Sequence, residues 1–178
     1  MTELLLIDEL VKRLRELFRG YTLLNKSGIL QEVKIFAQYL PQPSGISIMD
    51  KELKGVNNYV SEDYDNNFPC VIVKIDDVMD KEEGNADMSE CGVKLLCGIY
   101  DEAAESQGYR DVMNMQERIR ENLLNDRVIG GRYLLKMPMY TKLLNDDTWP
   151  VYFGEQKLIY EIGRPRMQEY IYHARRVH

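Results

Sequence analysis

Two short apolar stretches decide the fold: CVIVKID at residues 70 to 76 and CGVKLLCGIY at residues 91 to 100. In the first, Ile72 lies on the opposite face from Val71 and Val73, and the second repeats this pattern of apolar side chains on both faces. A strand that is apolar on both faces is typical of the centre of a sheet, where neither face meets water. The sequence therefore predicts two central strands.

Three further segments have strand-like patterns around this centre. They are EVKIFAQYL at 32 to 40, RYLLKMPMYTKLL at 132 to 144 and EQKLIYEI at 155 to 162. Pro138 cannot donate a hydrogen bond to a neighbouring strand, so its segment is expected at a sheet edge or bent at that point. In the last segment Leu158 and Tyr160 share a face with Ile162, which indicates a half-exposed strand.

Two amphipathic helices accompany the strands. Residues 3 to 19 place apolar side chains at spacings of three and four, which predicts a helix that ends near Gly20. Its expected buried face is Leu4, Ile7, Val11, Leu14 and Phe18, widened by Leu10 and Leu17. The second helix is predicted from about Gly108 to Asn125, with an apolar face of Tyr109, Val112, Met115, Ile119 and Leu123. This order predicts an α+β fold: a mainly antiparallel sheet of about four to five strands with two principal helices packed against it.

The length of 178 residues fits a single domain over residues 1 to 178. Two polar, turn-rich segments, 41 to 67 and 77 to 90, are expected to be long loops, and residues 166 to 178 a charged C-terminal tail. Loops of this length between strands commonly carry function.

The composition excludes several classes of function. A formal net charge of -6 and a pI near 5.1 lack the basic surface that binding to DNA or to an anionic membrane requires. No run approaches the ~20 apolar residues of a membrane span, and charges interrupt the N-terminal apolar segment where a signal peptide needs a continuous one. Three cysteines in strand-like segments indicate reduced thiols in the core.

Residues suited to catalysis are sparse. The two histidines, His173 and His178, lie in the charged tail, so a Ser-His-Asp or Cys-His site is not expected. Cys91 and Cys97 would lie about 20 Å apart along one strand and could not share a zinc ion. The segment RVIGGRY at 127 to 133 has no Lys-Ser or Lys-Thr after its glycines, so it predicts a turn rather than a phosphate-binding loop.

The acidic segment DVMDKEEGNADMSE at 77 to 90 is a candidate calcium site. Its candidate ligands are Asp77, Asp80, Glu82, Glu83 and Asp87. They do not follow the alternate-residue ligand spacing of an EF-hand, so a solvated loop is favoured. No metal and no cofactor is expected.

The stretch DDTWPVYFGE at 146 to 155 contains the single tryptophan. Its aspartate pair favours a turn and Pro150 restricts Trp149 to an extended conformation, so it is expected to connect two antiparallel strands. Trp149 is expected to cover the edge of the core. The alternative is an exposed aromatic that, beside Tyr152 and Phe153, marks a contact with another protein.

The order of three motifs carries a family resemblance. They are FPCVIVKIDD at 68 to 77, GVKLLCGIYDEAAESQGYRDVMNMQERIRENLL at 92 to 124, and PMYTKLLNDDTWPVYFGEQKLIYEIGRP at 138 to 165. Through them the chain resembles the tail terminator and minor tail proteins of long-tailed bacteriophages and prophages. The likeness covers roughly residues 68 to 165; the segment 41 to 67 and the C-terminal tail depart from the family pattern.

The resemblance implies a structural virion subunit and no enzyme. Such a subunit assembles in the bacterial host cytoplasm as a ring, typically a homohexamer, on the end of the tail tube, where it stops tube polymerisation and joins the tail to the head. The implied partners are further copies of the chain, the tail tube protein and the head–tail connector protein. The candidate contact residues are Trp149, Tyr152, Phe153, Asp77, Asp80, Glu82, Glu83 and Asp87.

The sequence leaves alternatives from other functional classes open. The paired Asp76 and Asp77, with Glu102 and Glu105, would suit a metal-dependent hydrolase or nuclease. A cytosolic binding domain, or a different phage neck or adaptor protein, would share the same lack of reactive residues.

Overall fold

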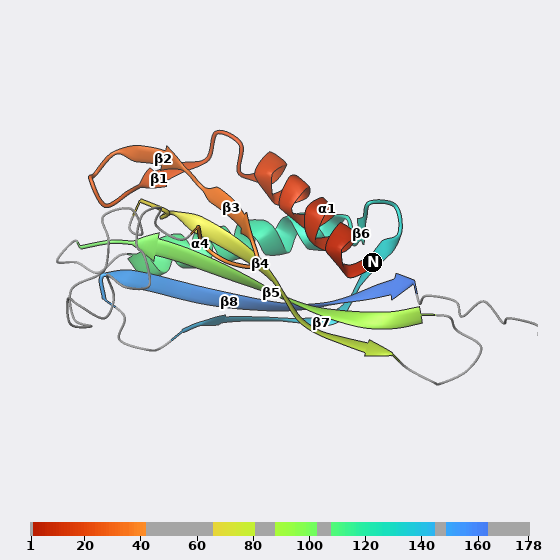
Figure 1. Cartoon of the computed structure of the whole chain (residues 1–178). Coiled ribbons are helices and arrows are strands. Elements are labelled where there is room, and N and C mark those ends of the chain that lie inside the picture. Colours follow the sequence, from red (N-terminus) through yellow and green to blue (C-terminus); the bar gives the residue numbers. More distant parts are fainter. Residues whose placement is uncertain (1, 42–65, 81–87, 103–107, 145–148, 164–178) are drawn as a thin grey trace, which may run out of the picture.

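The computed structural model describes residues 2–41, 66–80, 88–102, 108–144 and 149–163, in which two helices cover one face of a twisted sheet (Figure 1). The helices are α1, Thr2–Leu17, and α4, Gly108–Asn125. The strands are β1 Thr22–Leu24, β2 Leu30–Glu32, β3 Lys34–Ala37, β4 Cys70–Asp80, β5 Met88–Tyr100, β6 Val128–Ile129, β7 Tyr133–Leu143 and β8 Val151–Gly163. The α+β class is confirmed.

The sheet has six strands in the order β3-β4-β5-β8-β7-β6, and β1 pairs with β2 in a separate hairpin. All neighbours in the six-stranded sheet are antiparallel except β3 and β4, which run parallel. The predicted four to five strands is therefore too few. The one strand added to this sheet is β6, which has two residues. The strand predicted at 32 to 40 divides at Val33, so that β2 joins the separate hairpin and β3 joins the sheet.

The prediction of two central strands is confirmed for β5, which is paired on both sides, whereas β4 is paired on both sides only along Cys70–Val73. Both strands are longer than predicted. β4 continues to Asp80 and β5 begins at Met88, so strand pairing replaces both ends of the loop expected at 77 to 90. In this added pairing, Val78 stands opposite Cys91 of β5 and Asp80 stands opposite Ser89. Residues 42 to 65, 81 to 87 and 164 to 178 lie outside the described residues, so the other loop and the tail stay predictions.

The main core lies between the helices and the sheet. α1 contributes the buried side chains Leu6, Ile7, Leu10, Val11 and Leu14, and Phe18, directly after the helix, adds a sixth. Leu4, predicted in this face, is 53% exposed, whereas Leu6 is fully buried. The two leucines lie at opposite margins of the apolar stripe, so helical periodicity does not distinguish them, and contact with the sheet does.

α4 packs closely on β8 because of one glycine. A Cβ at Gly154 would lie 2.6 Å from Val112 Cγ1 and would also overlap the Gln116 side chain. Gln116 and Gln156 are buried and joined: Gln156 Nε2 donates to the Gln116 carbonyl at 2.9 Å, and Gln116 Nε2 donates to the Lys142 carbonyl at 3.1 Å. Buried polar side chains with such bonds fix the position of α4 over the sheet.

The face of the sheet away from the helices divides into an apolar half and a charged half. Its apolar half is a second cluster built on Phe68, Cys70, Ile72 and Tyr100. In its charged half, Lys136 Nζ lies 3.1 Å from Glu90 and 3.3 Å from Glu161, across three neighbouring strands. Half-exposed ion pairs of this kind add little stability, so this half is a solvent-facing or partner-facing surface.

Candidate assembly surfaces

The aromatic segment at the start of β8 separates into one exposed and two packed side chains. Trp149 is 59% exposed, so the expectation that it covers the core edge is wrong. Tyr152 packs against the main core beside Gly108, while Phe153 points to the other face and meets Phe68 edge-on, with ring centroids 5.8 Å apart. Tyr152 and Phe153 therefore support the fold, and Trp149 is the one available to a partner.

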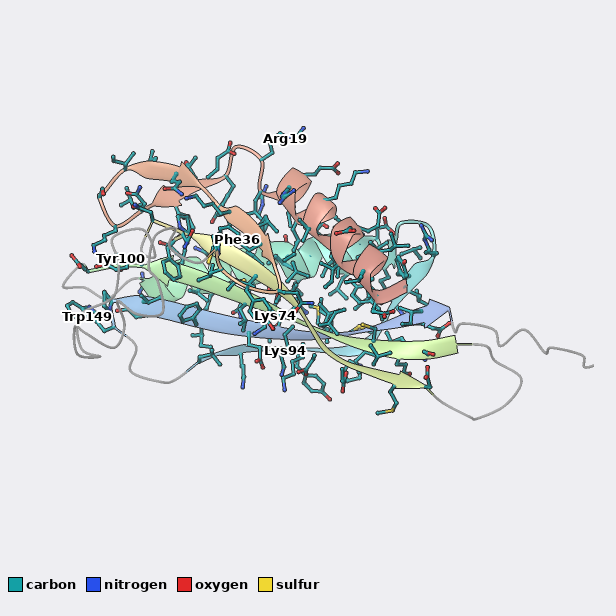
Figure 2. All side chains as sticks on the ribbon, viewed as in Figure 1. Arg19, Phe36, Lys74, Lys94, Tyr100 and Trp149 are labelled. Carbon is teal, nitrogen blue, oxygen red and sulfur yellow. The ribbon has the colours of Figure 1, made fainter. Side chains whose placement is uncertain are left out.

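The end of the molecule that carries Trp149 also carries the β1–β2 hairpin. Lys26, in the hairpin turn, lies 5.5 Å from the ring centroid of Tyr100, and the Asp101 amide donates to the Pro150 carbonyl at 2.9 Å. Figure 2 shows Trp149 and Tyr100 at this same end of the sheet. The hairpin contributes the exposed side chains Leu24, Ile29 and Leu30. Together, Trp149 and these three residues form what we call the apolar end.

The hairpin was missed in the sequence, although a signal for it is present. The turn NKSG at residues 25 to 28 separates TLL from ILQE. The Asn25 side chain accepts hydrogen bonds from the amides of Ser27 and Ile29, and Gly28 has a positive φ of 70°. An Asn-initiated turn closed by glycine between two apolar runs is a hairpin pattern.

The acidic side chains that the structure describes on β4 have separate partners. Asp77 and Asp80 lie on β4, where the Asp77 side chain sits over Gly92 and Asp80 accepts a hydrogen bond from Ser89. Asp76 forms an ion pair with Lys94. Glu82, Glu83 and Asp87 lie outside the described residues, so a contact role for them stays a prediction.

The hydrolase alternative depends on carboxylates that the structure describes only in part. Across the described part of the chain, no group of three or more His, Cys, Asp or Glu side chains could hold a metal ion. Glu102 accepts a hydrogen bond from Tyr100 rather than facing Asp76, and Glu105 lies outside the described residues, as do both histidines. No helix in the described ranges is long and apolar enough to cross a membrane.

The three cysteines are buried and free. Burial raises the pKa of Cys91 to about 11 and that of Cys70 to about 12, and it raises the pKa of Cys97 as well. A buried thiol with a raised pKa is a poor nucleophile at neutral pH, so these residues act as core side chains.

A polar hollow of about 610 Å³ lies between α1, the end of α4 and β6. Arg13 crosses it: Nε donates to Asn122 Oδ1 at 2.7 Å, a terminal nitrogen donates to the Asn122 carbonyl at 2.6 Å, and Asp126 lies 3.7 Å away. These bonds join α1 to the end of α4, so the polar side chains that line the hollow hold the two helices together.

The sheet has two stretches of edge that no described strand covers. β3 pairs with Cys70–Val73 only, which leaves Lys74–Asp80 of β4, and β6 pairs with Tyr133 and Leu134 only, which leaves Lys136–Leu143 of β7. We call these the β4 edge and the β7 edge. The backbone N–H and C=O groups of such edges can pair with a strand of another chain.

The two edges differ in charge and share exposed apolar side chains. The β4 edge carries three aspartates and one lysine, whereas the β7 edge carries two lysines and no carboxylate. Val78 and Met79 are exposed on the β4 edge, as are Met137 and Tyr140 on the β7 edge. The expected bend at Pro138 is confirmed, because the register of β7 shifts between Lys136 and Tyr140.

Comparison with known proteins adds no family: no protein-family model matches this chain, and no curated protein matches its sequence. The roles of the apolar end and of the two edges are therefore inferred from their own side chains and backbone groups.

Proposed function

We propose that the protein is a structural subunit that assembles with copies of itself into a ring, and that this ring caps a phage tail tube, stops its growth and joins the tail to the head. The tail-specific part of this proposal comes from the resemblance of residues 68 to 165 to tail terminator proteins. The self-assembly part is supported by the open edges of the sheet.

The observation that carries the proposal is the pair of unlike open edges on opposite sides of one sheet. A closed ring needs heterologous contacts, in which each subunit offers two different and complementary surfaces. The β4 edge and the β7 edge meet this requirement, because one carries aspartates and the other lysines, and two strands, β5 and β8, separate them in the order β4-β5-β8-β7.

The apolar end offers a third surface, distinct from both edges. Trp149 is 59% exposed, and Leu24, Ile29 and Leu30 are 57%, 63% and 65% exposed. Exposed aliphatic and aromatic residues gathered at one end are typical of a contact with another protein. In the proposed ring this end faces the tail tube or the head connector.

The test is a tube-growth assay with the tail tube protein of a phage or prophage whose genome encodes this chain. We expect added protein to shorten the tubes and to leave a visible cap at one end in negative-stain images. Trp149→Ala should weaken this effect while the fold is kept, and Met113→Ala, which removes an apolar side chain that is 50% exposed on α4, should not. Tubes that grow to the same length with and without the protein would contradict the proposal.

A further inference from the structure

We propose that the β4 edge of one copy pairs with the β7 edge of the next copy, so that the sheets of the ring join into one closed β-barrel. This inference rests on the ring assembly proposed above and names the contact that builds it. The occupant of each edge is a second copy of this chain, because the complementary edge is present on the same molecule.

Strand direction favours this contact. Each of the three neighbouring pairs between β4 and β7 is antiparallel, so β7 runs opposite to β4 within one subunit. When copies stand side by side in the same orientation, β7 of one copy therefore runs antiparallel to β4 of the next. The joined sheet keeps the antiparallel hydrogen-bond pattern that each subunit already has.

One register matches both the faces and the chemistry of the two edges. It places Asp77 opposite Lys142, Val78 opposite Thr141, and Met79 opposite Tyr140. Within one subunit, Asp77 and Met79 stand opposite Gly92 and Glu90 on the face away from the helices. Tyr140 and Lys142 stand opposite Lys157 and Glu155 on that same face. The proposed register therefore joins a carboxylate to an ammonium group and a thioether to an aromatic ring.

The same register gives the stagger that a closed barrel requires. Within one subunit, Asp77 stands opposite Gly92 of β5, and Gly92 stands opposite Ile159 of β8. Lys142 stands opposite Glu155, which is four residues from Ile159 along β8. Because this offset is even, side chains keep their faces. At ~3.4 Å per residue the stagger of four residues is about 14 Å, over four strands that span about 19 Å. The ratio corresponds to a strand tilt of roughly 35°, within the usual range for closed barrels.

Both edges also carry features that limit pairing with unrelated strands. The β7 edge has Lys136, Pro138 and a shift in register, and the β4 edge has a shift between Ile75 and Asp77. Lysine, proline and bulges on an edge oppose unspecific pairing. The stretches that stay regular, Asp77–Asp80 and Tyr140–Leu143, are the ones that the proposed register uses.

Cysteine cross-linking tests the register directly. Met79→Cys and Tyr140→Cys replace exposed side chains, and the three native cysteines are buried. A mixture of the two single variants, oxidised under native conditions, should give a disulfide-linked dimer that contains one of each. The chain with both substitutions should give a ladder of covalent oligomers on a denaturing gel. Each single variant alone should stay unlinked.

Charge reversal provides a second, independent measurement. Asp77→Lys should weaken self-association roughly tenfold, because two lysines would then face each other, and adding Lys142→Asp should restore it. Asp8→Lys makes the same charge reversal at an exposed aspartate of α1, so it is the matched control and should leave self-association unchanged. If rings form but neither the cross-link nor the rescue is seen, the proposed pairing is wrong while the ring function stands. If the parent protein forms no ring under any condition, both fail.

Discussion

Phe153→Ala separates a structural role from a contact role within the aromatic segment. Phe153 packs on Phe68 with an interplanar angle of 70°, in the cluster that also contains Cys70 and Ile72. Truncation of a fully buried Phe costs about 3–5 kcal/mol, and Phe153 is half-buried, so we expect a loss of about 2–3 kcal/mol of unfolding free energy. This corresponds to roughly a hundredfold shift of the folding equilibrium.

Equilibrium unfolding in urea, followed by far-ultraviolet circular dichroism, measures this loss. The midpoint should fall while the slope stays constant, because a change in slope would report an altered unfolded state. Trp149→Ala is the matched control in the same segment, and its change should stay within about 0.5 kcal/mol because the side chain is mostly exposed. Equal, small effects of both substitutions would refute the assignment of Phe153 to the core.

A glycine beside the two rings allows the contact itself to be measured. A Cβ at Gly98 would lie 2.7 Å from Phe68 Cε1 and 2.8 Å from Phe153 Cε1. Gly98→Ala should therefore be destabilising in the parent and less so in Phe153→Ala, where one of the two overlaps is gone. A double-mutant cycle should give a coupling of about 0.5–2 kcal/mol. Strictly additive effects would show that the two sites do not touch.

Further predictions concern the main core and its thiols. Leu6→Ala should cost about 2–5 kcal/mol and Leu4→Ala less than about 0.5 kcal/mol in urea unfolding; the reverse order would restore the helix face predicted from the sequence. Arg13→Ala should cost about 1–3 kcal/mol by removing both bonds to Asn122, and an unchanged midpoint would deny that link between the helices. The pKa of Cys91 is raised from 9.0 to about 11, so the unfolded chain loses this proton first. Its contribution to stability should be complete below pH 9 and lost as the pH rises toward 11; unfolding midpoints that do not fall between pH 8.5 and 10.5 would contradict this.

The centre of the fold could be predicted from the sequence because its signals are local. The runs at 70 to 76 and 91 to 100 are apolar on both faces, and these runs become β4 and β5 in the interior of the sheet. The helix at Gly108–Asn125 follows a clear three-and-four spacing and has the predicted bounds. Such patterns depend on neighbours a few residues apart, which the sequence displays directly.

The features that matter for assembly could not be predicted, because they depend on partners distant in sequence. The parallel pairing of β3 with β4 joins segments more than thirty positions apart, and it decides how much of β4 is left as an open edge. Asp77 and Asp80 have low strand propensity and lie in β4 because β5 pairs with them. The exposure of Trp149 likewise depends on what packs nearby, since a proline-bounded turn before β8 fits a buried or an exposed side chain equally well.

Native mass spectrometry of the purified chain at tens of micromolar, supported by electron-microscopy class averages, tests the central claim most directly. The two unlike edges predict one closed cyclic oligomer with a single stoichiometry and a central channel, and Asp77→Lys should shift it toward monomer. A protein that stays monomeric at every concentration and in the presence of tail tubes, or one that forms only two-fold symmetric dimers, would contradict the claim.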